Sequence, residues 1–173
     1  MIKKAALFGI ASLLVLAAPA QAAEGPSDPE IAHIAYTAGT IDISAARQAL
    51  KKSGNKAVRA FAEEMARDHQ AVNEKALALV KTLKVTPADN AISASLSRDA
   101  AATEERLAGL EGAAFDRAYL QNEVAYHKAV NGALESTLIP SADNGDLKAL
   151  LETGLTLFRE HQAHAEHVLA ELK

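Results

Sequence analysis

Apolar residues recur three or four positions apart over residues 56–84, a spacing that places them on one face of an α-helix. The stripe consists of Val58, Phe61, Met65, Val72, Leu79 and Leu83. His69 lies on the same stripe, where an aliphatic side chain is expected. Two later segments repeat the pattern with His127 and His161. The chain must therefore bury several amphipathic helices against one another, three of them with a histidine on the buried face.

The same spacing predicts five helices, separated by glycine, proline and asparagine signals. Their predicted ranges are residues 28–53, 56–84, 91–110, 113–138 and 146–173. Asp28-Pro29-Glu30 predicts the start of the first helix, with Asp28 as the N-cap. Good helix formers dominate the composition, and no alternating β-branched run predicts a strand. The predicted fold class is therefore all-α.

The segment 91–110 is shorter and more polar than the other four. It can lie on their surface and carry the chain back to the opposite end. We therefore expect a ferritin-like four-helix bundle with a crossover helix between the second and third long helices. Five alternating antiparallel helices are the alternative.

The first 22 residues have the pattern of a cleavable signal peptide. Lys3 and Lys4 precede an apolar run over residues 5–18, and Ala20-Gln21-Ala22 fits the cleavage rule. The alternative is an uncleaved membrane anchor. The predicted organisation is a signal peptide at 1–22, a linker at 23–27 and one bundle domain at 28–173. It implies export to the periplasm, with no transmembrane span in the mature form.

The composition limits the chemistry and the partners of this chain. It has no cysteine, so disulfides and thiolate metal sites are excluded. The formal charge is −4, and it becomes −6 once Lys3 and Lys4 are removed. An acidic chain with few aromatic residues is not expected to bind nucleic acid. An envelope protein or a second copy of the chain are the partners left open.

Four polar residues are predicted to meet at the middle of the bundle. Asp42 and His69 lie twelve residues before and fifteen residues after the first hairpin turn at Gly54. His127 and His161 lie at similar distances from the second turn, so a crossover topology stacks all four at one height. Glu123 is one helical turn before His127 on the same face.

These five residues form a candidate metal site. Neutral imidazole and carboxylate groups suit iron, manganese or zinc. They also suit a hydrogen-bonded polar layer with a purely structural role, which is the alternative. Histidines buried in the neutral state predict that stability is lost as the pH falls through about 6.5.

No catalytic signature is present in the sequence: it lacks the Gly-x-Ser-x-Gly motif, the P-loop and the dinucleotide fingerprint. We therefore expect a non-catalytic envelope or stress-related protein, with a metal-binding protein or metalloenzyme as the alternative. Binding of haem or a small apolar ligand is a third hypothesis. The many alanines rank it last, because they predict tight packing without a roomy pocket.

Three motifs carry a resemblance to a known family: Phe61-Ala-x-x-Met65-x-x-Asp68-His69, Phe115-Asp116-x-x-Tyr119-Leu120-x-x-x-Val124-x-x-His127, and His161 followed by Ala165. Together they resemble the bacterial family called domain of unknown function 4142, over residues 28–172. The resemblance implies an exported ferritin-like bundle and brings no established activity. The family's recurrent histidines would correspond to His69, His127 and His161, and its usual helix-one glutamate to Asp42.

A di-iron centre of the ferritin type needs a glutamate three residues before its histidines. His69, His127 and His161 are instead preceded at that position by Ala66, Val124 and Phe158. A mononuclear site with histidine and carboxylate ligands is therefore predicted in preference to an oxygen-activating di-iron centre.

Overall fold

The computed structural model describes residues 25–172, which are helical and contain no β-strand. The main helices are α1 (Asp28–Lys52), α2 (Lys56–Leu83), α3 (Ala91–Ala108), α4 (Gly112–Ala133) and α6 (Gly145–Glu171). A π-helical turn, η1 (Leu134–Leu138), and the short α5 (Ile139–Ser141) join α4 to α6. The prediction of an all-α chain with five main helices is confirmed for these residues. The predicted signal peptide, residues 1–22, lies outside the described residues, as do linker residues 23 and 24.

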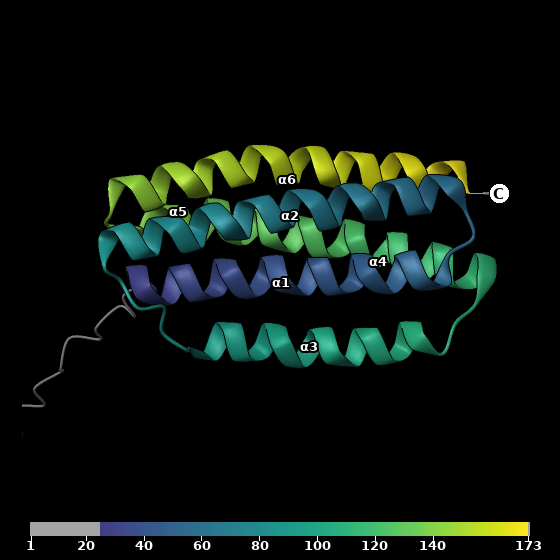
Figure 1. Ribbon diagram of the computed structural model, residues 1–173, viewed down its shortest axis with the longest axis horizontal. Coiled ribbons are helices and arrows are strands. Elements are labelled where there is room, and N and C mark those ends of the chain that lie inside the picture. The colour runs from purple at the N-terminus through teal and green to yellow at the C-terminus, as the bar shows by residue number, and fades with distance from the viewer. Residues whose placement is uncertain (1–24, 173) are drawn as a thin grey trace, which may run out of the picture.

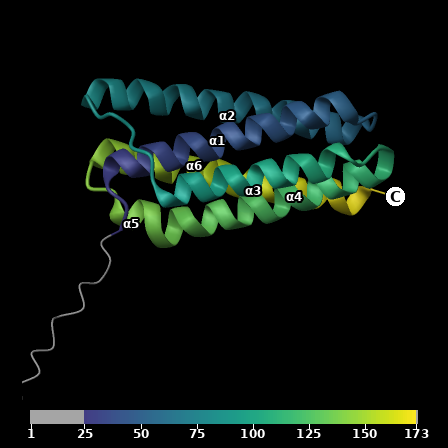
Figure 2. The same ribbon diagram turned by 90° about the horizontal axis from the view of Figure 1, so that it is seen from below.

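Two antiparallel helix pairs, α1 with α2 and α4 with α6, pack side by side (Figure 1). The pairs meet where α2 contacts α6 and where α1 contacts α4. The remaining helix, α3, lies outside this group along α1 and α4 (Figure 2). It carries the chain from the end of α2 back to the opposite end of the molecule, so α2 and α4 run in the same direction (Figure 1). This arrangement brings the midpoints of α1, α2, α4 and α6 together.

The first helix is capped one residue earlier than predicted. Ser27, not Asp28, is the N-cap, and it forms a capping box with Glu30. The Asp28 carboxylate instead accepts hydrogen bonds from the backbone N–H groups of Asp143 and Asn144, both at 3.0 Å. The sequence identified a helix start correctly but missed a contact between segments more than a hundred residues apart.

The predicted continuous helix over 113–138 is wrong in its last turn. The α-helical pattern ends at Ala133 and widens into η1, and α5 then includes Pro140, which the sequence placed in a loop. Proline has no N–H to donate to the carbonyl four residues earlier, which favours an irregular turn ahead of it. The Ser136 hydroxyl donates to the Gly132 carbonyl at 2.7 Å within this turn. The other predicted helix ends either coincide with the structure or differ from it by one or two residues.

The two halves of the bundle are packed differently. One half contains large, fully buried side chains, among them Phe61, Met65, Phe115 and Tyr119. The other half is lined by aliphatic residues of α1, η1 and α6, including Ile31 and Leu138. On α2, no side chain beyond Asn73 is fully buried. Among the helices of residues 25–172, none has both the length and the apolar character needed to cross a bilayer.

Gly39 on α1 permits close contact with α2. A Cβ atom at this position would collide with the Asn73 side-chain amide, which donates to Thr40 at 3.3 Å. We expect Gly39→Ala to lower the free energy of unfolding by about 1–3 kcal/mol, because the buried amide must move. Gly132→Ala is the matched control, since an added Cβ there meets nothing within 4 Å. It should raise stability by up to about 1 kcal/mol. Urea denaturation measures both, and equal effects would contradict the packing argument.

Candidate functional site

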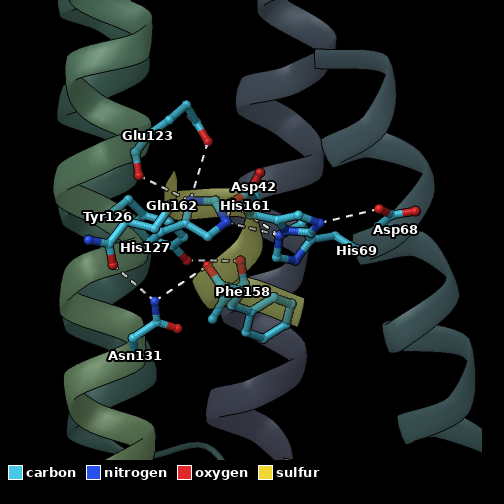
Figure 3. A network of polar contacts seen from close by, with 11 residues as sticks. Asp42, Asp68, His69, Glu123, Tyr126, His127, Asn131, Phe158, His161 and Gln162 are labelled. Atoms are coloured by element: carbon cyan, nitrogen blue, oxygen red, sulfur yellow. Dashed lines mark hydrogen bonds and ion pairs between the residues drawn. The ribbon is translucent and has the colours of Figure 1, made fainter. Parts of the chain in front are cut away.

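Four helices each contribute one polar side chain to the middle of the bundle (Figure 3). These are Asp42 from α1, His69 from α2, His127 from α4 and His161 from α6. None is more than 3% exposed. On α1 the structure buries Asp42 and leaves its neighbour Ile41 partly exposed. Likewise it buries His127 and leaves Tyr126 partly exposed.

Three ligand-type atoms face one another across a small triangle. The Nε2 atoms of His69 and His127 are 3.4 Å apart. One Asp42 carboxylate oxygen lies 3.4 Å from the first and 3.5 Å from the second. Two nitrogen ligands that each bind a tetrahedral zinc ion at 2.0–2.1 Å are about 3.3 Å apart. The triangle therefore has the dimensions of one face of a tetrahedral metal site.

The His127 ring is oriented by its own helix. Its Nδ1 atom lies 3.0 Å from the Glu123 backbone carbonyl, one turn earlier. A carbonyl can only accept, so the neutral ring carries its proton on Nδ1 and has a lone pair on Nε2. This is the usual way in which a protein fixes the tautomer of a metal-binding histidine. Nε2 is the atom directed at His69 and Asp42.

The third histidine is held from the opposite direction. His161 Nε2 lies 3.2 Å from a carboxylate oxygen of Asp68, which is not among the five predicted site residues. Its Nδ1 atom is buried and has no hydrogen-bond partner within the described chain. One ligand atom from each of His69, His127 and His161 lies within 4.8 Å of the others. Asp68 immediately precedes His69, and that adjacency is the only sequence signal for its role.

Glu123 lies behind His127, on the side away from Phe158 (Figure 3). Its carboxylate is 3.8 Å from His127 Nδ1 and is 1% exposed. Asp42, Glu123 and His127 also form a group of three ligand atoms within 4.8 Å. The structure thus places all five predicted residues in one buried cluster, which we call the polar layer.

The carboxyl groups of the polar layer are difficult to ionise. Burial raises the pKa of Asp42 to about 7. Burial and the nearby Asp42 carboxylate raise the pKa of Glu123 well above its usual value. Neither oxygen of Asp42 has a hydrogen-bond partner within residues 25–172. An isolated buried carboxylate is costly, and no Lys or Arg among the described residues of this cluster offsets that cost.

The histidines of the polar layer are held in the neutral state. Burial lowers the pKa of His127 to about 4, although its bond to the Glu123 carbonyl acts in the opposite direction. Burial and the charges that His127 and His161 would carry lower the pKa of His69 well below its usual value. Burial also lowers the pKa of His161, against the opposing effect of Asp68. Neutral imidazole is the form that binds metal ions.

The remaining histidines lie outside the polar layer. His33 lies 2.9 Å from the Ser93 hydroxyl and 2.9 Å from an Asp89 carboxylate oxygen, at the start of α3. His164 is partly exposed and lies 2.8 Å from Glu64 on α2. His167 is exposed and lies 3.4 Å from Glu171. These contacts are typical of surface pairs.

The expectation of tight packing without a pocket is wrong for one half of the bundle. A cavity of about 360 Å³ begins at the polar layer and extends toward the N-terminus of α1 and the C-terminus of α4. His69, His127 and Phe158 lie at its inner end, and the Phe158 ring stacks on His69 with 4.7 Å between centroids. Alanine and glycine occupy many lining positions. Their side chains are too small to fill the distance between the helix backbones, so space is left between the helices.

The fold and the polar layer define a class: an all-α helical protein with a buried histidine and carboxylate cluster. A family model described as "Domain of unknown function (DUF4142)" matches residues 14–168, so the chain belongs to this family. The predicted resemblance is confirmed. None of the curated proteins matches the sequence.

A solved structure is similar in fold: "Crystal structure of putative secreted protein DUF305 from Streptomyces coelicolor". The two share 13% sequence identity with a TM-score of 0.69, over 82% of this chain and 91% of the other. At this identity the similarity extends to the fold alone.

Proposed function

We propose that this protein is an exported, periplasmic ferritin-like bundle that binds one divalent transition metal ion in the polar layer. The ligands would be His69, His127, His161 and Asp42, with Glu123 adjacent. One observation carries the proposal: two imidazole nitrogens and a carboxylate oxygen form a triangle of 3.4, 3.4 and 3.5 Å, and this oxygen has no hydrogen-bond partner within residues 25–172. A bound cation would neutralise Asp42 and use the lone pair that His127 directs inward.

Zinc fits this triangle best, and iron or manganese accept the same ligands. Histidine tautomers support the proposal, since the bond of His127 to the Glu123 carbonyl and that of His161 to Asp68 each leave a lone pair on the second ring nitrogen. The ferritin-like part of the proposal rests on the directions of α2 and α4, between which α3 acts as the crossover. Export rests on the pattern of residues 1–22, and cleavage after Ala22 would leave the bundle domain at 28–173.

Elemental analysis of the tag-free protein tests the proposal. After loading with zinc, manganese or ferrous iron and removal of free metal, we expect about one ion per chain. A His69→Ala, His127→Ala double variant should retain none, because it loses two of the three ligand atoms that form the triangle. A His164→Ala, His167→Ala double variant is the matched control, and it should retain the ion.

Three results would contradict the proposal. One is a wild-type protein that retains no metal under any of the loading conditions. Another is retention by the His69, His127 variant. The third is loss in the control variant alone, which would place the ion at the surface. In the first case the polar layer is a structural network, and the double variant should then be destabilised without any metal effect.

A further inference from the structure

The cavity next to the polar layer has the size and lining of a ligand pocket. Its volume of about 360 Å³ falls within the range of small-molecule sites. It is more than twice the volume of an apolar cavity of about 150 Å³ that binds benzene. Six small residues from four helical walls create the space: Ala35, Ala38, Ala76, Ala129, Ala133 and Gly154.

The walls of the cavity are unevenly covered, which gives a ligand access. Beyond Asn73, the apolar side chains of α2 that face this region are only partly buried. Ile92 of α3, which also lines the cavity, is 45% exposed. The π-helical turn η1 forms another part of the wall through Leu134 and Leu138. Such turns occur frequently at functional sites.

The lining determines which charge a ligand can carry. None of the described residues that line the cavity is Asp, Glu, Lys or Arg. A carboxylate or ammonium group in this environment would lose its hydration without gaining an opposite charge. Fatty acids, and haem with its two carboxylates, are therefore disfavoured. The occupant must be uncharged and largely apolar.

His69 lines the inner end of the cavity, and one of its ring nitrogens has no partner within residues 25–172, which favours a hydrogen-bonding group on the ligand. His69 Nε2 faces His127 and Asp42, but His69 Nδ1 is buried and has no partner within residues 25–172. His69 as a whole is 3% exposed. A hydroxyl group can both donate and accept, so it satisfies Nδ1 in either tautomer of the ring.

We propose that the cavity binds one uncharged, largely apolar molecule with a terminal hydroxyl group, such as a medium-chain alcohol or an alkylphenol. The apolar part occupies the space between the small residues, and the hydroxyl group lies at His69 beside Phe158. This binding uses the chain without metal, so it does not depend on the proposed metal site.

Fluorescence of the uncharged probe N-phenyl-1-naphthylamine tests the proposal on the purified metal-free protein. We expect saturable binding of one probe per chain, displaced by decan-1-ol. Decanoate should require at least about tenfold higher concentrations at about pH 8, because its carboxylate must be desolvated. Equal displacement by the alcohol and the carboxylate would overturn the assignment of an uncharged ligand.

Two cavity-filling variants locate the binding. Ala76→Phe should weaken probe binding at least about tenfold, because the added ring occupies the space. Ala78→Phe is the matched control on the same helix, since Ala78 is exposed and does not line the cavity; it should bind as the wild type does. Ala133→Phe fills the cavity from α4 and serves if Ala76→Phe does not fold, as judged by circular dichroism.

The following results would overturn the proposal. Unchanged binding in both filled variants would place the probe elsewhere. A second outcome is a wild-type protein that binds no probe and sediments as a dimer, while the Ala76→Phe variant is monomeric. That result would assign this face to a second copy of the chain. No binding by a monomeric wild type would leave the cavity without the proposed occupant.

Discussion

Replacing Asp42 by asparagine is expected to stabilise the metal-free protein by about 1–3 kcal/mol at about pH 8 and to abolish most of its stabilisation by zinc. Above its pKa of about 7, the buried Asp42 carboxylate is charged and has no hydrogen-bond partner within the described chain. Asparagine has nearly the same shape and no charge, so it removes the desolvation cost. The same change removes the one anionic ligand of the triangle.

Thermal or urea denaturation with and without zinc measures both effects. In the wild type, free zinc at about a hundred times its Kd should add about 2.7 kcal/mol. Asp68→Asn is a matched control because Asp68 contacts His161 from outside the triangle. Its pKa is lowered, since hydrogen bonds from Arg67 and His161 outweigh the effect of burial, so its replacement should destabilise the fold. Destabilisation of the metal-free Asp42→Asn protein would favour the purely structural layer.

The stability of the metal-free protein is expected to pass through a maximum near pH 6. The polar-layer histidines have folded pKa values below the unfolded value of about 6.5, so their contribution is lost as the pH falls from 6.5 toward 4. Asp42 has the opposite sign. Its pKa is raised from 3.8 to about 7, so its contribution falls as the pH rises through that window. The raised pKa of Glu123 acts in the same direction as that of Asp42.

Below about pH 6 the effect of the three histidines outweighs that of the two carboxyl groups. The free energy of unfolding should therefore fall by roughly 1 kcal/mol for each unit by which the pH is lowered. Above about pH 6.5 the carboxyl groups dominate and stability should fall again. The expectation from the histidines alone, that stability is only lost on acidification, therefore omits the opposite effect of the carboxyl groups. Denaturation midpoints measured between about pH 5 and 8 test this pH dependence. The Asp42→Asn variant is the control, because it removes one of the two buried carboxyl groups. That variant should lose much of the decline at high pH, and a flat profile in the wild type would contradict neutral burial of the histidines.

The fold was predictable because helical periodicity is a local property of the sequence. The stripe through Phe61, Met65 and His69 determines which face of α2 is buried, and the structure buries all three. Errors occurred where contacts distant in sequence decide the outcome. The position of Asp28 predicts an N-cap, but its carboxylate accepts hydrogen bonds from the backbone before α6. The sequence does not predict the π-helical turn before Pro140, because the apolar residues in this turn keep the spacing of an α-helix.

The candidate site was predictable in its members but not in its geometry. Counting residues from the hairpin turns gives the height of Asp42, His69, His127 and His161, because each helix rises by a fixed amount per residue. It cannot give the distance between rings, the tautomer of His127 or the pairing of His161 with Asp68. These depend on side-chain rotamers and on how closely neighbouring helices approach.

Residue spacing along the chain is sufficient to predict the helices, their buried faces and a polar layer at mid-height, because each of these follows from the regular rise and turn of a helix. The folded structure is needed to show that two imidazole nitrogens and a carboxylate oxygen form a triangle of metal-site dimensions. Only it revealed the cavity beside them, because empty space depends on the distance between helices, and alanines that could have packed tightly instead line a gap.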